Sequence, residues 1–190
     1  MEITTRSVWT LIHGMGFGGL YLLAGTGATF ALYQAFQPVE RDQASTHPSR
    51  LIGIYLSVMA ALAWLAVLSG TYIIYPWYRA SAPIGEHNLK AYPRALLLSS
   101  PSTSAWHSLG MEWKEHVAWL VPIAITMAAV VALRYGREIV NHPRLRVGLL
   151  AFVGTSLIAS GVAGFFGAML DKVAPVEGGQ TIRLVKGDQR

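Results

Sequence analysis

Residues 51–78 of the chain read LIGIYLSVMAALAWLAVLSGTYIIYPWY, a stretch that contains no Asp, Glu, Lys or Arg. A helix needs about 20 predominantly apolar residues to cross the hydrocarbon core of a bilayer. Because lipid offers no partner to an unpaired backbone N–H or C=O group, a run of this length and composition has to be helical there. The stretch therefore predicts a transmembrane helix.

Three further apolar stretches accompany this one. Together they predict four transmembrane helices over residues 7–37, 51–78, 112–134 and 147–170. The composition agrees, because 53% of the residues are hydrophobic and only 13% are charged, whereas soluble domains carry about 25% charged residues. We therefore expect an all-α, integral membrane four-helix bundle in contact with the lipid bilayer.

The connections between the predicted helices define two faces of this bundle. The short basic segments Pro38–Arg50 and Arg134–Arg146 lie on one face, named face B, and the long loop 79–110 and both termini lie on the other, face A. The four-helix domain covers 1–172, and a polar tail covers 173–190. Basic short loops favour the cytoplasm, so the termini are expected outside. The net charge of +5 is then typical of headgroup anchoring and predicts no nucleic-acid partner.

A short repeat precedes the second and fourth predicted helices. Residues 47–53 read HPSRLIG and residues 142–148 read HPRLRVG, with His-Pro and Gly at the same offsets. The repeat favours two duplicated helix hairpins, in which the first helix corresponds to the third. Proline also suits the first turn of any helix, so shared helix-start chemistry is the competing explanation.

One histidine lies near the face-A end of the first helix and one near that of the third. Trp9 precedes His13 by four residues and Trp113 precedes His116 by three. Since tryptophan favours the membrane interface, both imidazoles are expected one turn deeper, at similar depth. Two imidazoles on facing helices of a bundle can supply both axial ligands of a haem iron. The chain has no cysteine, which excludes covalent c-type haem and cysteine-ligated iron–sulfur clusters.

The residues around these histidines fit a flat cofactor that carries negative charge. Gly16 lies in the small-residue segment 14–19 (GMGFGG) beside His13, which lets a porphyrin or a neighbouring helix approach closely. Several basic residues of face A are within the expected reach of haem carboxylates: Arg6, Arg79, Arg94 and Lys114. Arginine is the better geometric match for a carboxylate. Headgroup contact is the competing role for each of them.

With one histidine on each of two co-directional helices and no cysteine, the chain resembles four-helix membrane b-type cytochrome subunits. The resemblance implies one haem b held by His13 and His116, and electron transfer between a redox partner on face A and quinone or a larger membrane complex. A soluble cytochrome is one such partner. The resemblance also implies a multi-pass protein of the bacterial inner membrane, working as a subunit of an oxidoreductase complex without catalytic residues of its own.

Several alternatives stay open. His107 is the rival of His116 as a ligand, since residues 107 and 116 point to opposite sides of one helix. Glu112 and His116 share a helical face and could bind iron, zinc or copper together with His107 or His13. His47 and His142 on face B fit a loop role better than ligation. At the level of the whole chain, a cofactor-free structural or assembly subunit and a small permease compete with the cytochrome.

Overall fold

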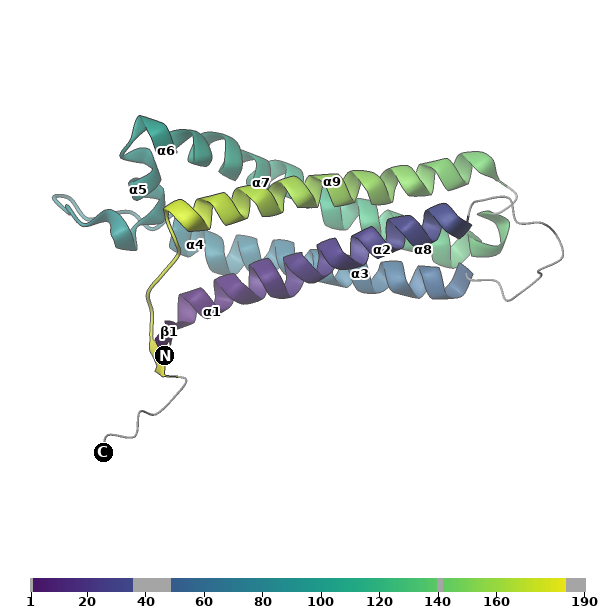
Figure 1. Cartoon of the computed structure of the whole chain (residues 1–190), viewed down its shortest axis with the longest axis horizontal. Helices are drawn as coiled ribbons and strands as arrows, with labels where there is room; N and C mark the ends of the chain where they lie inside the picture. The colour runs from purple at the N-terminus through teal and green to yellow at the C-terminus, as the bar shows by residue number, and fades with distance from the viewer. Residues whose placement is uncertain (1, 36–48, 140–141, 184–190) are drawn as a thin grey trace.

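The computed structural model describes residues 2–35, 49–139 and 142–183, and these are mostly helical. Four of its helices are long and apolar enough to cross a membrane: Thr5–Gln34, Arg50–Tyr78, Pro101–Gly136 and Pro143–Val173. They lie lengthwise beside one another in an elongated bundle (Figure 1). The all-α four-helix prediction is confirmed at this level.

Three of the four long helices are built from pieces with different hydrogen-bond periods. The first consists of α1 (Thr5–Leu11), the π-helix η1 (Ile12–Gly19) and α2 (Leu20–Ala35). The second consists of α3 (Ser49–Ser69), the π-helix η2 (Gly70–Ile74) and α4 (Tyr75–Tyr78). The fourth, α9 (Pro143–Val173), is a single α-helix.

The third long helix is the most divided and begins earlier than expected. It runs through α6 (Pro101–Ala105), the π-helix η4 (Trp106–Met111), α7 (Glu112–His116), the 3₁₀ turn η5 (Val117–Trp119) and α8 (Leu120–Ile139). Ser100 caps its start by accepting a hydrogen bond from Ser102 N at 3.4 Å, with Pro101 in the first turn. This Ser-Pro pair is a helix-start signal, so residues 101–110 belong to the helix and not to the loop predicted over 79–110.

The remainder of that loop lies at the face-A end of the bundle. It contains the 3₁₀ turn η3 (Leu89–Ala91) and α5 (Pro93–Leu98), which lies at the same end as α4 (Figure 1). Leu97 of α5 is fully buried in a small cluster with Tyr78, Met111 and Leu170. The loop is therefore packed onto the helix ends.

The termini also meet at face A. Strand β1 (Glu2–Thr4) pairs antiparallel with strand β2 (Thr181–Arg183). The backbone N–H of Thr5 donates to the carbonyl of Gln180 at 2.9 Å. Of the tail predicted over 173–190, residues 173–183 are described. Val173 ends α9, and the pairing of β2 with β1 ties the following residues to the beginning of the chain.

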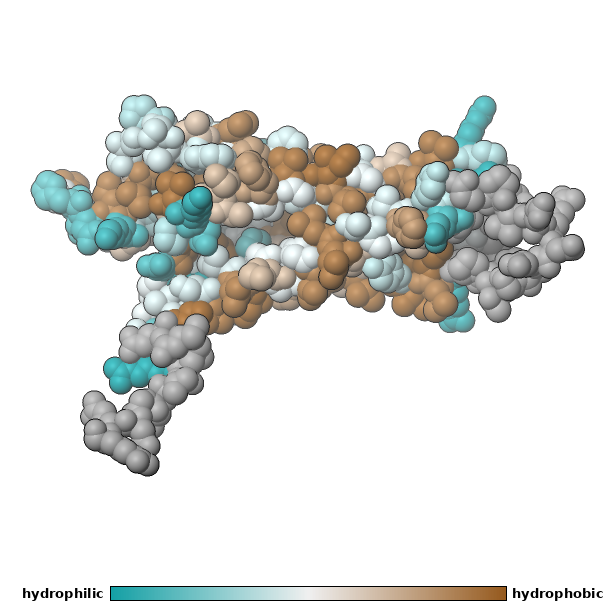
Figure 2. All heavy atoms as spheres, viewed as in Figure 1, coloured by the Kyte–Doolittle hydropathy of each residue, from teal (hydrophilic) through white to brown (hydrophobic). Residues whose placement is uncertain are grey.

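The main core lies where the four helices pack along their length. Leu56, Ile125 and Val153 have no exposed surface, and they come from α3, α8 and α9. Many large apolar side chains point outward instead, including Leu23, Phe30 and Ile158. Figure 2 shows apolar residues over the middle of the bundle and hydrophilic residues towards its ends.

The repeat predicted from the two His-Pro segments is only half described. His47 lies outside the described residues, whereas His142 is exposed immediately before α9. The two glycines of the repeat have different surroundings. A Cβ added to Gly53 would lie 2.6 Å from Leu133 Cδ2, whereas one added to Gly148 would meet nothing within 4 Å.

Candidate functional site

The face-A half of the bundle contains all three π-helical segments found in the described residues. They are η1, η2 and η4, and each belongs to a different long helix. A π-turn widens the helix and changes the direction of the side chains that follow it, and such turns are frequent at functional sites. His13 lies in η1 and His107 in η4, while Gly70, the first residue of η2, packs against His13.

His13 points towards the second long helix and is held there by one hydrogen bond. Its Nδ1 lies 3.1 Å from the Oγ of Ser69, whose hydroxyl donates to the carbonyl of Ala66 at 3.1 Å. Because a serine hydroxyl has only one proton, its oxygen accepts from His13, which places the imidazole proton on Nδ1. The Nε2 atom then carries the free lone pair, which is the atom a metal would use.

Gly70 makes room for the edge of this imidazole. A Cβ added at position 70 would lie 2.7 Å from Cε1 of His13 and 3.4 Å from both ring nitrogens. Any larger residue would therefore push the ring away from Ser69. Ser69 and Gly70 together hold the His13 ring in position. Neither residue was among the predicted site residues. A polar residue followed by glycine inside an apolar span is the signal that points to them.

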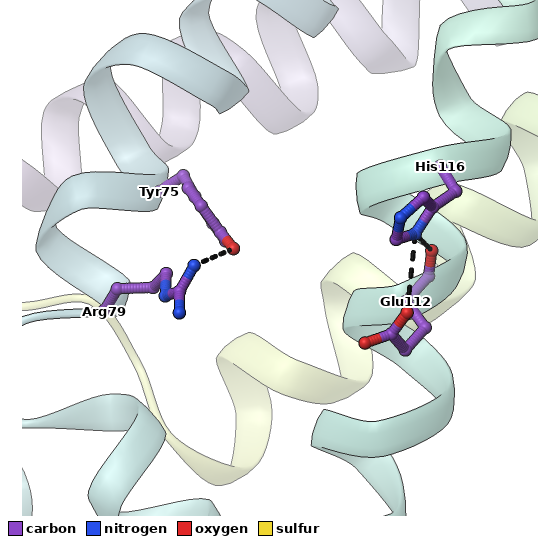
Figure 3. Close-up of polar contacts among 4 residues, drawn as sticks. All are labelled: Tyr75, Arg79, Glu112 and His116. Atoms are coloured by element: carbon purple, nitrogen blue, oxygen red, sulfur yellow. Dashed lines mark hydrogen bonds and ion pairs between the residues drawn. The ribbon is translucent and has the colours of Figure 1, made fainter.

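His116 is also fixed through Nδ1, within its own helix. The atom lies 3.0 Å from the carbonyl oxygen of Glu112 and 3.4 Å from the Oε2 of the same residue. A carbonyl can only accept, so Nδ1 carries the proton and Nε2 is again the free acceptor. The side chain is 71% exposed. Figure 3 shows its ring projecting from α7 towards the side on which Tyr75 and Arg79 lie.

The predicted rival, His107, is engaged with another helix. Its Nδ1 lies 2.7 Å from the hydroxyl of Tyr78, and the two rings are 5.9 Å apart. The tyrosine hydroxyl can donate or accept, so the protonated nitrogen of His107 is not determined. Among the residues that the structure describes, His13, His107 and His116 each make separate polar contacts and do not hydrogen-bond to one another.

The basic residues predicted to meet haem carboxylates have different surroundings. Arg6 lies over the ring of Trp77 at 5.5 Å. Arg79 lies over the ring of Tyr75 and donates to its hydroxyl at 3.0 Å. The Nε of Arg94, on α5, is buried and has no hydrogen-bond partner in the described part of the chain.

Gly16, the predicted small neighbour of His13, does not make room for another helix at its Cβ position. A Cβ added there would meet only Ile12 of the same segment, at 3.9 Å. The close approach to His13 is made by Gly70.

The alternative of a multi-ligand metal site gains no support in the described ranges. Over residues 2–35, 49–139 and 142–183 there is no group of three or more His, Asp or Glu side chains that could hold a metal ion together. Glu112 and His116 do lie side by side, but within these ranges neither His13 nor His107 joins them. An axially ligated cofactor, which needs only one or two imidazoles, is not subject to this limit.

Comparison with known proteins gives no functional assignment, so the geometry described above is the basis for one. No protein-family model matches the chain, and neither the curated proteins nor the solved structures contain a match.

Proposed function

We propose that the chain is an integral membrane electron-transfer subunit that binds one haem b through His13 and His116. The membrane part of the proposal is supported by the four long apolar helices and by the large apolar side chains on their outer surface. In lipid such side chains face the acyl chains, whereas in water they would form an extensive apolar surface that favours aggregation.

The position of the proton on each of the two imidazole rings supports the haem part of the proposal. Each has its proton fixed on Nδ1 by an acceptor, the Ser69 hydroxyl for His13 and the Glu112 carbonyl for His116. A histidine that ligates a metal through Nε2 almost always donates Nδ1–H to such a group, which fixes the tautomer and the ring orientation. His107 lacks this property, since the Tyr78 hydroxyl can either donate to its Nδ1 or accept from it. This difference favours His116 over His107.

The roles of the residues follow from their places in the bundle. Ser69 and Gly70 orient His13, and Glu112 orients His116. Bound haem iron supplies reversible one-electron chemistry, and the protein sets its position and surroundings. Tyr75, Arg79 and Glu115 lie on the face-A side, where a redox partner such as a soluble cytochrome would dock.

Location and partners belong to the same proposal. Quinone or other subunits of a membrane complex would exchange electrons with the haem, in a bacterial inner membrane. The described basic residues at face B include Arg50, Arg134 and Arg144, all exposed. Their density in short connections favours face B in the cytoplasm and the termini outside.

An absorption spectrum of the purified protein tests the proposal. We expect a Soret band that shifts and sharpens on reduction in the wild type and is strongly reduced in His13→Ala and in His116→Ala. His142→Ala, which removes an exposed histidine at the other end of the bundle, is the matched control and should keep the band, as should His107→Ala.

Two results would overturn the assignment. A correctly folded wild type that stays colourless with haem available would favour the cofactor-free structural subunit. Retention of haem by both the His13 and the His116 variants would show that the ligands lie elsewhere.

A further inference from the structure

The first long helix is packed differently in its two halves. Three side chains of α2 are buried in the core at helical spacing: Tyr21, Ala28 and Leu32. Within residues 5–19, which form α1 and η1 and are all described, no residue is buried. The other three long helices each bury a side chain at the face-A end: Tyr78, Met111 and Leu170. The face-A half of the first helix therefore lies on the bundle without being anchored in its core.

The polar contacts of this half with the second long helix are few and lie near the surface. Arg6 lies over the ring of Trp77 at 5.5 Å, and His13 hydrogen-bonds to Ser69 at 3.1 Å. Segments with few buried apolar contacts open locally while the rest of a protein stays folded. Residues 5–19 have this property, whereas α2 does not.

The π-helix η1 connects this half to the anchored half. Its sequence includes residues 14–19 (GMGFGG), in which four of the six residues are glycine. Glycine allows backbone angles that other residues avoid, and hinges absorb a large change of direction within a few residues. The segment is therefore suited to act as a hinge between α1 and α2.

A strap formed by residues 174–183 leads from the end of α9 to the start of the first helix. Figure 1 shows it as the yellow trace that runs from α9 to β1. At the α9 end of the strap, Ala174 and Val176 are buried in the same cluster as Leu170. This end is therefore fixed on the bundle.

The other end of the strap holds the first turn of α1. The backbone N–H of Arg6 donates to the carbonyl of Gly178 at 3.3 Å, and that of Gln180 donates to the Oγ1 of Thr5 at 3.2 Å. Gly179 has a φ of +86°, and a Cβ added there would collide with Oγ1 of Thr5. Hydrogen bonds that water can replace contribute little net stability, so this contact can open and close.

We propose that residues 5–19 form a gate that swings on η1, and that the strap is the latch that holds the gate shut. When the strap releases Thr5 and Arg6, the gate moves away from α9 and draws His13 away from Ser69. The state of the strap then controls whether the His13 ring is exposed. The inference concerns the packing of the first helix and does not depend on haem.

Spin-label distances test the gate directly, because a chain without cysteine carries labels only where cysteines are introduced. Leu11→Cys on the gate and Lys172→Cys on α9 both replace exposed residues. Gly179→Ala should add a population several ångströms longer to the distance distribution measured by double electron–electron resonance. Gly85→Ala is the matched control, since Gly85 has a φ of +85° in the long loop and an added Cβ meets nothing within 4 Å. It should give the wild-type distribution.

A disulfide across the latch tests the gate without a change of sequence between the two samples. Ile3 and Ile182 lie opposite each other in the β1–β2 pair, at a separation that a disulfide can bridge. In the double variant Ile3→Cys/Ile182→Cys, diethyl pyrocarbonate should modify His13 severalfold more slowly when the bridge is oxidised than when it is reduced. Peptide mass spectrometry measures this rate, and the exposed His142 of the same molecules, which should react equally in both states, is the reference.

The gate requires both results. Identical distance distributions for Gly179→Ala and Gly85→Ala would show that the strap does not hold the first helix in place. A His13 reactivity that is the same in the oxidised and reduced forms would show that the latch does not control access to the ring, and this comparison stands even if Gly179→Ala does not fold. Neither measurement uses haem, so each outcome bears on the gate and leaves the proposed function to its own spectrum.

Discussion

The two halves of the bundle are built differently, although all four helices run through both. In the face-B half, α2, α3, α8 and α9 are regular α-helices whose apolar side chains interlock. In the face-A half, π-turns interrupt three of the four helices, and histidine, lysine and serine side chains lie between them. Regular packing gives stability, whereas irregular turns present polar groups to a ligand at some cost in stability.

The largest expected effect comes from placing a charge in the regular half. Ile125 of α8 is fully buried in the main hydrophobic core cluster. Ile125→Asp would bury an unpaired carboxylate at a cost of several kcal/mol, and we expect no folded protein after size-exclusion chromatography in detergent. The same change at Ile84, which is 109% exposed in the loop, should give normal yield. Normal folding of Ile125→Asp would mean that the core is not closed there.

A smaller effect distinguishes the two glycines of the repeat. Gly53 on α3 faces Leu133, whose Cα would lie 3.2 Å from an added Cβ, whereas Gly148 on α9 faces open space. Gly53→Ala should lower the free energy of unfolding by about 1–3 kcal/mol. Gly148→Ala should be neutral or stabilise by up to about 1 kcal/mol, because alanine is the better helix former. Thermal denaturation of both variants measures the difference, and equal shifts would remove the contrast.

The substitution Gly70→Ala tests the irregular, face-A half of the bundle in the same way. The added methyl group would collide with the His13 ring, which can rotate away, and not with backbone. We therefore expect little change in melting temperature but about tenfold weaker haem binding, since the imidazole would leave Ser69. Soret titration and thermal denaturation of the same sample check both parts. A large loss of stability with unchanged haem affinity would contradict the distinction between the halves.

The smallest effect concerns a polar link inside the regular half. Tyr21 of α2 donates to the Oγ of Ser156 in α9 at 2.7 Å, and Ser156 donates in turn to the carbonyl of Val153. Tyr21→Phe removes one buried hydrogen bond and should cost about 0.5–1.5 kcal/mol. Tyr33→Phe, on the exposed side of the same helix, should be silent in the same denaturation assay. A silent Tyr21→Phe would indicate that packing alone joins these helices.

The number and approximate places of the helices follow from the sequence, because length and apolarity suffice to find them. The predicted span 51–78 agrees with the candidate span Arg50–Tyr78. The predicted third span, 112–134, begins about ten residues after the observed helix, whose start is capped by Ser100 with Pro101 in the first turn.

The orientations of the site side chains about their helix axes were harder to predict from the sequence. The depth inferred from the flanking tryptophans stays a prediction, and the rotation of each histidine about its helix axis could not be predicted. A π-turn such as η4 adds a residue to one turn and so turns every later side chain by about 100°. Nothing in residues 106–111 (WHSLGM) indicates such a turn, so the sequence could not decide which of His107 and His116 faces which neighbour.

The clasp between β1 and β2 imposes an order on biosynthesis. Strand β2 follows α9 in the chain, so its pairing with β1 cannot form until the fourth helix has left the ribosome. Closing so large a loop is slow relative to local helix formation. The first helix therefore takes up its orientation while its leading edge is still free, and the joining of the two strands marks the completion of the translated bundle.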